Sequence, residues 1–353
     1  MSEKNFHIPS LDGIRALAIM IVFFAHAGLG HVVPGGFGVT VFFFLSGYLI
    51  TTLLRREYEK YGEISLRKFY LRRVYRIFPP LYIVLILGIV LAFAMGEAAS
   101  MKFWPVASQF LHTTNYYTSF NGEAELVPHT AVLWSLAVEE HFYLVFPLLL
   151  ITLARKNPLD KVGRILIAGC VLVLAWRYIL VIGLDIGFPY TYRASETRMD
   201  SILFGCIMGL WRNPILDGDA FRSNGQRILA LGAAACLLLF TFVYRDETFR
   251  ETLRYTLQGI ALWPVFYLAI SCYHWPLFKW LDWAPMRVIG ILSYTMYLVH
   301  QACLHVAETF LSGHGPTLLS GVAGFALTIA ISAAMYVGIE KRMGDLRKKM
   351  HDA

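Results

Sequence analysis

Apolar stretches of about 20 residues, each long enough to cross a hydrocarbon core of about 30 Å as a helix, recur along the whole of this 353-residue chain. A soluble core needs no runs of this length. Apolar residues make up 57% of the sequence and charged residues only 16%, which also places the chain outside the soluble class. The sequence therefore predicts an all-α protein whose solvent is the lipid bilayer.

The apolar stretches predict a polytopic bundle of about ten transmembrane helices. Its expected spans are residues 10–29, 35–54, 77–95, 131–153, 165–183, 195–211, 228–244, 255–273, 288–310 and 317–339. The apolar part of the sixth span, residues 201–211, is too short to cross alone, so Arg198 and Asp200 are expected within the membrane or at its edge. Residues 102–118 are expected to form an interfacial or re-entrant piece.

The distribution of basic residues predicts the orientation of the bundle. With the N-terminus in the cytoplasm, 23 of the 31 Lys and Arg residues fall in inside segments and only 6 in outside segments. This bias predicts that both termini are cytoplasmic. Membrane orientation also explains the net charge of +7 better than a nucleic-acid partner, because the basic residues are not gathered on one patch.

The chain is expected to be one transmembrane domain over residues 1–353, without a soluble appendage, an internal repeat or a cleavable signal. The five cysteines lie in apolar stretches without paired spacing, so they are interpreted as packing residues. No metal site and no permanently bound cofactor are expected.

Ionisable residues inside a bilayer cost several kcal/mol and persist mainly where they are paired, hydrated or functional. The first span carries Arg15 and His26, whose separation of 11 residues places them on one helix face about 16 Å apart. Such a pair can hold a long ligand at one end and act on its other end. The structural alternative is a buried histidine bonded to a neighbouring helix, with Arg15 reaching toward the surface.

A second basic group, Arg72, Arg73 and Arg76, ends a cytoplasmic loop just before Pro79 and Pro80. Arg73 and Arg76 are three residues apart and share a helical face. Their forked donors suit phosphate. Lipid headgroups and the general basicity of cytoplasmic loops are the alternative explanation.

Further polar residues lie at predicted span ends. Glu139 and Glu140 begin a helix, where one of them is a candidate to orient a reacting histidine and the other to act as a capping charge. The remaining candidates are substrate contacts or interhelical polar clamps: Arg198, Asp200, Tyr297 and His300.

With these residues, the sequence resembles the acyltransferase-3 family of bacterial integral membrane O-acyltransferases. The resemblance rests on seven segments in family order: SLDGIRALAIMIVFFAHAG, GGFGVTVFFFLSGYLIT, FYLRRVYRIFPP, LWSLAVEEHFYLVFPLL, TRMDSILFG, SYTMYLVH and YVGIEKRM. The family's Arg-x10-His feature falls on Arg15 and His26, and its Arg-x-x-Arg feature falls on Arg73 and Arg76. The family's usual Gln after the paired glutamates is replaced by His141.

The resemblance implies a multi-pass protein of the bacterial cytoplasmic (inner) membrane that transfers an acyl group, usually acetyl, from acyl-CoA to a hydroxyl of a glycan or a small molecule. On this basis Arg15, Arg72, Arg73 and Arg76 are predicted to bind acyl-CoA, and His26 and Glu140 to be catalytic. His26 would act as a base or carry the acyl group itself. The rival interpretation is a proton-coupled transporter of a polar solute, which buried charges also fit. The lack of a repeat and the clustering of arginines on one side count against it.

Overall fold

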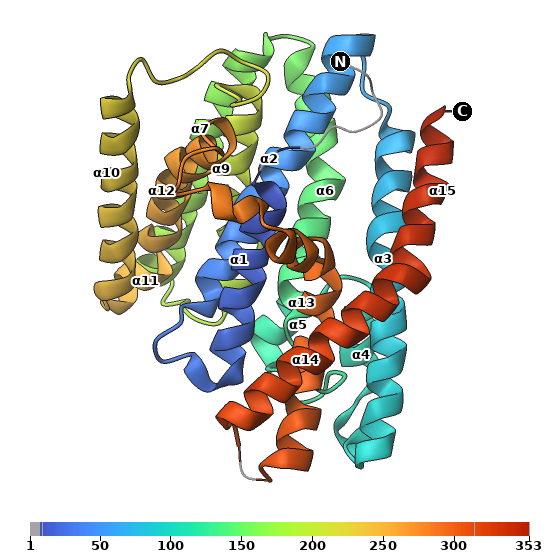
Figure 1. The fold of residues 1–353 in the computed structure, drawn as a ribbon. Coiled ribbons are helices and arrows are strands. Elements are labelled where there is room, and N and C mark those ends of the chain that lie inside the picture. Colours follow the sequence, from blue (N-terminus) through green and yellow to red (C-terminus); the bar gives the residue numbers. More distant parts are fainter. Residues whose placement is uncertain (1–7, 9, 314, 353) are drawn as a thin grey trace.

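The computed structural model describes residues 8, 10–313 and 315–352, with side chains as far as residue 346. The described chain is helical and contains no strand (Figure 1). Its long helices are α1 (Leu11–Phe24, continued by a π-helical turn Ala25–Leu29), α2 (Gly35–Tyr61), α3 (Leu66–Met95), α6 (Leu133–Ala154), α7 (Leu159–Tyr178), α9 (Ser195–Leu210), α10 (Asn224–Val243), α12 (Leu253–Ser271), α13 (Ala284–Leu311), α14 (Leu318–Met335) and α15 (Lys341–Asp352). Short helices lie between them: α4 (Phe103–Phe110), α5 (Thr114–Asn121), α8 (Tyr190–Arg193) and α11 (Glu247–Glu251).

Seven helical segments of the described chain are long and apolar enough to cross a membrane, which confirms a polytopic helical protein. They are Leu11–Leu29, Gly35–Tyr61, Leu66–Met95, Leu133–Ala154, Leu159–Gly183, Asn224–Val243 and Leu318–Leu346. Three further predicted spans correspond to α9, α12 and α13. α9 has 16 residues, about 24 Å of helix, and α12 and α13 carry more polar side chains. The predicted count of about ten spans is therefore not confirmed.

Residues 102–118 do not cross the bilayer. They form α4 and α5, of eight residues each, joined at His112 with a left-handed φ of 55°. Eight residues of helix extend about 12 Å, far short of the hydrocarbon core. The predicted interfacial or re-entrant character agrees with this length.

One end of the bundle, which we call the basic end, carries the α2–α3 turn, the 211–223 loop and α15. These segments lie together at the top of Figure 1. The opposite end carries α4, α5, α11 and the 122–132 loop, in the lower half of the same view. The assignment of the basic end to the cytoplasm rests on the positive-inside rule and stays a prediction.

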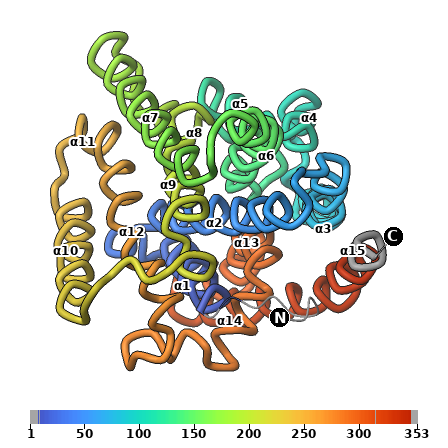
Figure 2. The backbone as a smooth tube through the Cα atoms, turned by 90° about the horizontal axis from the view of Figure 1, so that it is seen from above, coloured from blue at the N-terminus to red at the C-terminus, as the bar shows by residue number. Residues whose placement is uncertain are grey.

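The centre of the bundle is α2, which lies between α6 and α9 on one side and α1 and α13 on the other (Figure 2). Two glycines allow α2 and α9 to approach closely. A Cβ on Gly47 would lie 2.0 Å from the carbonyl oxygen of Ile202, and a Cβ on Gly205 would lie 2.0 Å from that of Phe44. Small residues at such a crossing are typical of helices packed within membranes.

A fully buried ion pair joins α7 to α9 beside α12. Arg177 donates from both terminal nitrogens to the Asp200 carboxylate, at 3.0 and 2.6 Å, and Thr256 donates to the same carboxylate at 2.9 Å. Neither charged side chain is exposed. Asp200 was predicted as a substrate contact or an interhelical polar clamp, and its partner in the structure is Arg177 of α7. Asp200 is thus an interhelical clamp.

We expect Asp200→Ala to destabilise the protein by about 3–5 kcal/mol, because it leaves the Arg177 guanidinium buried without its carboxylate. The double variant Arg177→Met with Asp200→Leu removes both charges and should recover most of this loss. Thermal unfolding in one detergent, followed by circular dichroism, measures both. Equal destabilisation by the double variant would contradict this account of the pair.

Candidate active site

The three arginines predicted to bind phosphate lie on helix α3 itself. The expected loop before residue 77 is helical instead, because α3 begins at Leu66, where the Ser65 side chain accepts a hydrogen bond from the Lys68 N–H. The helix continues through Pro79 and Pro80. A helix through this region fixes the directions of the arginine side chains, which a loop would not.

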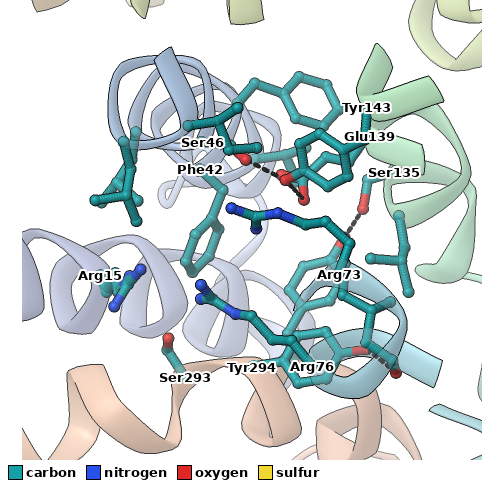
Figure 3. Close-up of a pocket in the computed structure, with 18 residues that line it drawn as sticks. Arg15, Phe42, Ser46, Arg73, Arg76, Ser135, Glu139, Tyr143, Ser293 and Tyr294 are labelled. Carbon is teal, nitrogen blue, oxygen red and sulfur yellow. Dashed lines mark hydrogen bonds between the residues drawn. The ribbon is translucent and has the colours of Figure 1, made fainter. Parts of the chain in front are cut away.

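Arg73 and Arg76 line a cavity of about 100 Å³ inside the bundle, and Arg15 of α1 lines it with them. Figure 3 shows the three guanidinium groups around Phe42 of α2. Arg72 does not line the cavity, and it donates instead to Glu57 at 2.9 Å. The structure therefore brings together three of the four arginines predicted to bind acyl-CoA.

The cavity carries an excess of positive charge. Among the described residues that line it, Glu139 is the carboxylate beside the three arginines. Arg15 also pairs with Asp12 at 3.1 Å, while the Arg73 guanidinium lies 5.1 Å from the centre of the Tyr143 ring. Guanidinium groups in a low-dielectric setting attract phosphate through forked, charge-assisted hydrogen bonds. The cavity is suited to an anionic ligand.

A short hydrogen-bond chain holds Glu139 at the cavity wall. Tyr143, one helical turn along α6, donates to the Glu139 carboxylate at 2.9 Å, so the Ser46 hydroxyl of α2 donates to the Tyr143 oxygen. Glu139 thus accepts at the cavity surface and is not only a capping charge.

The cavity is closed toward the opposite end by Tyr297 and Phe42. Their rings are 6.0 Å apart in an edge-to-face arrangement, and both side chains line the cavity. The Tyr297 hydroxyl donates to the Val132 carbonyl at 3.1 Å and bonds Ser135 at 2.6 Å. On its other side, the Tyr297 ring lies 5.8 Å from the ring of His300.

His26 and His300 form a pair beyond this closure. The Nε2 atom of His300 lies 3.2 Å from Nδ1 of His26, which also lies 2.9 Å from the Val22 carbonyl. His300 Nδ1 faces the carbonyls of Met296 and Tyr297 at 3.2 and 2.8 Å.

These contacts assign both tautomers. A carbonyl only accepts, so His300 carries its proton on Nδ1 and offers a lone pair at Nε2. His26 Nδ1 then faces two acceptors and must carry the proton of that ring. The Nε2 atom of His26 is left with a lone pair, as a general base or a nucleophile requires.

His26 is exposed at the opposite end of the bundle, whereas His300 is fully buried. His26 lies in the π-helical turn after α1, just before Ala27 and Gly28 leave helical geometry, with Gly28 at φ 94°. The helical backbone expected between Arg15 and His26 therefore continues as far as His26 and ends directly after it. Tyr297 lies between the two groups, because it lines the cavity and its ring also contacts His300, the partner of His26.

Glu140 does not partner His26. Its Oε1 atom is buried without a hydrogen-bond partner in the described chain, it does not line the cavity, and no hydrogen bond joins the two residues there. The side chain that contacts His26 is His300, which comes from a helix far along the chain. The neighbouring His141 bonds Ser195 at 2.7 Å and stacks on Tyr116, so it packs α6 against other elements.

Arg198 is buried among aromatic rings. Its guanidinium carbon lies 4.0 Å from the centre of the Tyr255 ring, and it donates to Thr40 of α2 at 3.0 Å. Cation–π contacts of this kind stabilise a desolvated cation. Arg198 does not line the cavity, so its observed contacts are those of a clamp between α9 and α2.

The sequence analysis missed several polar residues of the cavity, which are Ser46, Ser135, Tyr143, Ser293 and Tyr294. Tyr143 had a detectable signal, because it follows Glu139 at the four-residue spacing of helical neighbours. The serines had none, since a hydroxyl within an apolar helix is common.

We expect nitrogen-15 spectra of histidine-labelled protein to show His26 in the form protonated at Nδ1. In His300→Leu the His26 ring loses one of its two acceptors and should populate both tautomers. His274→Leu, at an exposed loop position, is the matched control. A wild-type His26 protonated at Nε2 would contradict the assignment.

Comparison with known proteins identifies the family of the chain. The sequence model of a family described as an acyltransferase domain matches residues 8–337. The chain is 30% identical over 352 residues to the peptidoglycan O-acetyltransferase OatA of Listeria monocytogenes, covering 95% of this chain and 55% of that protein. It is 28% identical to the putative peptidoglycan O-acetyltransferase YrhL of Bacillus subtilis, covering 96% of this chain and 55% of that protein. It is 30% identical to the O-acetyltransferase OatA of Staphylococcus aureus, covering 97% of this chain and 58% of that protein.

The chain thus spans just over half the length of these curated relatives, and no solved structure matches it. The family match covers nearly the whole chain and includes every segment that builds the cavity and the histidine pair. The chain belongs to the acyltransferase-3 family.

Proposed function

We propose that this protein transfers an acetyl group from acyl-CoA, bound at the three-arginine cavity, to a hydroxyl of a glycan that approaches His26 from the opposite face. The observation that carries the proposal is the placement of Arg15, Arg73 and Arg76 around one cavity, whose wall residue Tyr297 contacts His300 of the histidine pair. The names of the relatives support an acetyl group and a peptidoglycan-type acceptor. They do not favour the transporter interpretation.

Donor binding follows from the chemistry of the cavity. The phosphates of acyl-CoA would accept from Arg73 and Arg76, with Arg15 completing the positive wall. Glu139 would hold the polar amide groups of the pantetheine arm. The thioester can reach His26 only if the Phe42 and Tyr297 side chains swing apart, so their contact is a gate in this proposal.

In the transfer step, His26 would carry the proton from the acceptor hydroxyl to the leaving thiolate. In direct transfer, the acceptor oxygen bonds to the thioester carbonyl carbon while its proton passes to His26 Nε2. The carbon–sulfur bond breaks, and the coenzyme A thiolate takes that proton. In the two-step route, His26 Nε2 first bonds to the carbonyl carbon as the carbon–sulfur bond breaks and the thiolate leaves. The acceptor oxygen then bonds to that carbon as the carbon–nitrogen bond breaks, and its proton passes to the freed Nε2 and from there to the thiolate. The exposed Nε2 lone pair serves either route.

Replacement of Arg76 tests the donor site. We expect Arg76→Ala to weaken coenzyme A binding by about 10–100-fold, because hydrogen bonds to charged groups contribute about 1.5–3 kcal/mol each. Arg72→Ala is the matched control, since Arg72 pairs with Glu57 outside the cavity. Isothermal titration in nanodiscs measures both. A larger loss with Arg72→Ala than with Arg76→Ala would place the donor elsewhere.

Replacement of His26 tests the chemistry. His26→Ala should abolish thiol release from acetyl-CoA in the presence of peptidoglycan fragments, yet leave coenzyme A binding intact, because the cavity lies beyond the gate. His274→Ala should retain activity. Incubation with labelled acetyl-CoA alone separates the routes, since an acid-labile label on His26 indicates the two-step one. Full activity of His26→Ala would refute the proposed role.

A further inference from the structure

Three potential metal ligands converge at the opposite end of the bundle, outside the cavity and the histidine pair. They are Glu97 after α3, His129 in the 122–132 loop and His305 of α13, and their ligand atoms all lie within 4.8 Å of one another. Glu97 Oε2 lies 3.1 Å from His129 Nε2, and Glu97 Oε1 lies 2.8 Å from His305 Nε2. No metal site is expected from the sequence.

Each ligand is held by backbone structure. α3 ends at Gly96 with φ 77°, and the Glu97 N–H bonds the Ala92 carbonyl at 2.8 Å, which fixes Glu97 directly after the helix. His129 has a left-handed φ of 60°, a conformation that a residue other than glycine rarely adopts. His305 projects from the regular helix α13. The cluster is therefore positioned by three separate segments.

Hydrogen bonding does not account for the whole cluster. His305 Nε2 is buried and, although Glu97 Oε1 is only 2.8 Å away, it has no hydrogen-bond partner in the described chain. The distance would allow a hydrogen bond, so it is the angle at the ring nitrogen that does not: His305 Nε2 does not point straight at the Glu97 oxygen. The two imidazole rings stack at 3.8 Å between centres, which would be unfavourable if both were charged.

The carboxylates at the cluster also suit a cation. A neutral imidazole at neutral pH offers the lone pair that a metal needs. Glu308, one turn beyond His305, is close enough to act on His129 and adds a second carboxylate to balance a divalent ion.

We propose that Glu97, His129 and His305 bind a divalent transition-metal ion of the zinc type. Two imidazoles and one carboxylate are ligands that Zn²⁺ accepts, and three protein ligands leave a coordination position open. Ca²⁺ and Mg²⁺ prefer oxygen ligands and fit this set poorly. Small rotations of the side chains would bring the three ligand atoms to bonding distance of about 2.0–2.2 Å.

The ion would tie three segments that surround the path to His26. His129 lies four residues before α6 begins, and His305 lies five residues after His300 on α13. A metal bridge from these residues to the end of α3 would fix the outer ends of α3 and α13 relative to the 122–132 loop. This site is independent of donor binding at the arginine cavity.

The test uses the full chain, purified without a histidine tag, stripped with a chelator and titrated with Co²⁺ or Zn²⁺. The wild type should bind a single ion per chain and show the visible absorption of four-coordinate Co²⁺. Its thermal unfolding temperature should rise when Zn²⁺ is added. His129→Ala, His305→Gln and Glu97→Gln should each weaken binding at least about tenfold. His274→Ala and Glu63→Gln, both at exposed positions, are matched controls and should bind like the wild type.

Retained coenzyme A binding and a single gel-filtration peak show that each variant is folded. Because the arginine cavity is elsewhere, a failure of the metal site leaves coenzyme A binding unchanged and is distinguishable from a failure of the proposed function. The proposal is overturned if the stripped wild type binds neither ion, or if folded ligand variants bind as tightly as the two controls.

Discussion

A guanidinium group inside a bilayer must be compensated, and the way each buried arginine is compensated organises this protein. Arg177 is neutralised by Asp200 and joins α7 to α9. Arg198 is surrounded by aromatic rings and joins α9 to α2. Arg15, Arg73 and Arg76 instead face one cavity in which carboxylates are outnumbered. The first two arrangements stabilise the bundle, whereas the third leaves positive charge available to a ligand.

The active-site elements are divided between the two ends of the bundle. Helices α1, α3 and α13 contribute residues to the arginine cavity, on the side of the basic end. The exposed imidazole of His26 lies toward the opposite end, next to the fully buried imidazole of His300. The aromatic contact between Phe42 and Tyr297 separates them. In the proposed function, this separation keeps the donor site and the acceptor site apart. Tyr297 contacts both groups, since it lines the arginine cavity and its ring lies beside His300.

Much of the architecture was predictable. Long apolar runs predicted helices in a membrane, and the arginines on α1 and α3 were predicted to act together. The predicted helix boundaries were less accurate where polar residues continue a helix beyond its apolar part. Residues 66–76, for example, belong to α3 although the predicted span begins at residue 77. The predicted number of crossings is not confirmed, because α9, α12 and α13 are not among the described helices that qualify by length and composition.

The sequence by itself determined the solvent, the helical class and the residue types able to bind phosphate or move a proton, because these depend on composition and on spacing within one helix. Only the tertiary structure decided the partners. His300 rather than Glu140 contacts His26, Arg177 rather than Arg198 pairs with Asp200, and Arg72 turns away to Glu57. Contacts between distant helices depend on their rotation and crossing, and a shift of one residue rotates a side chain by about 100° around its helix. No local pattern in the sequence specifies that rotation.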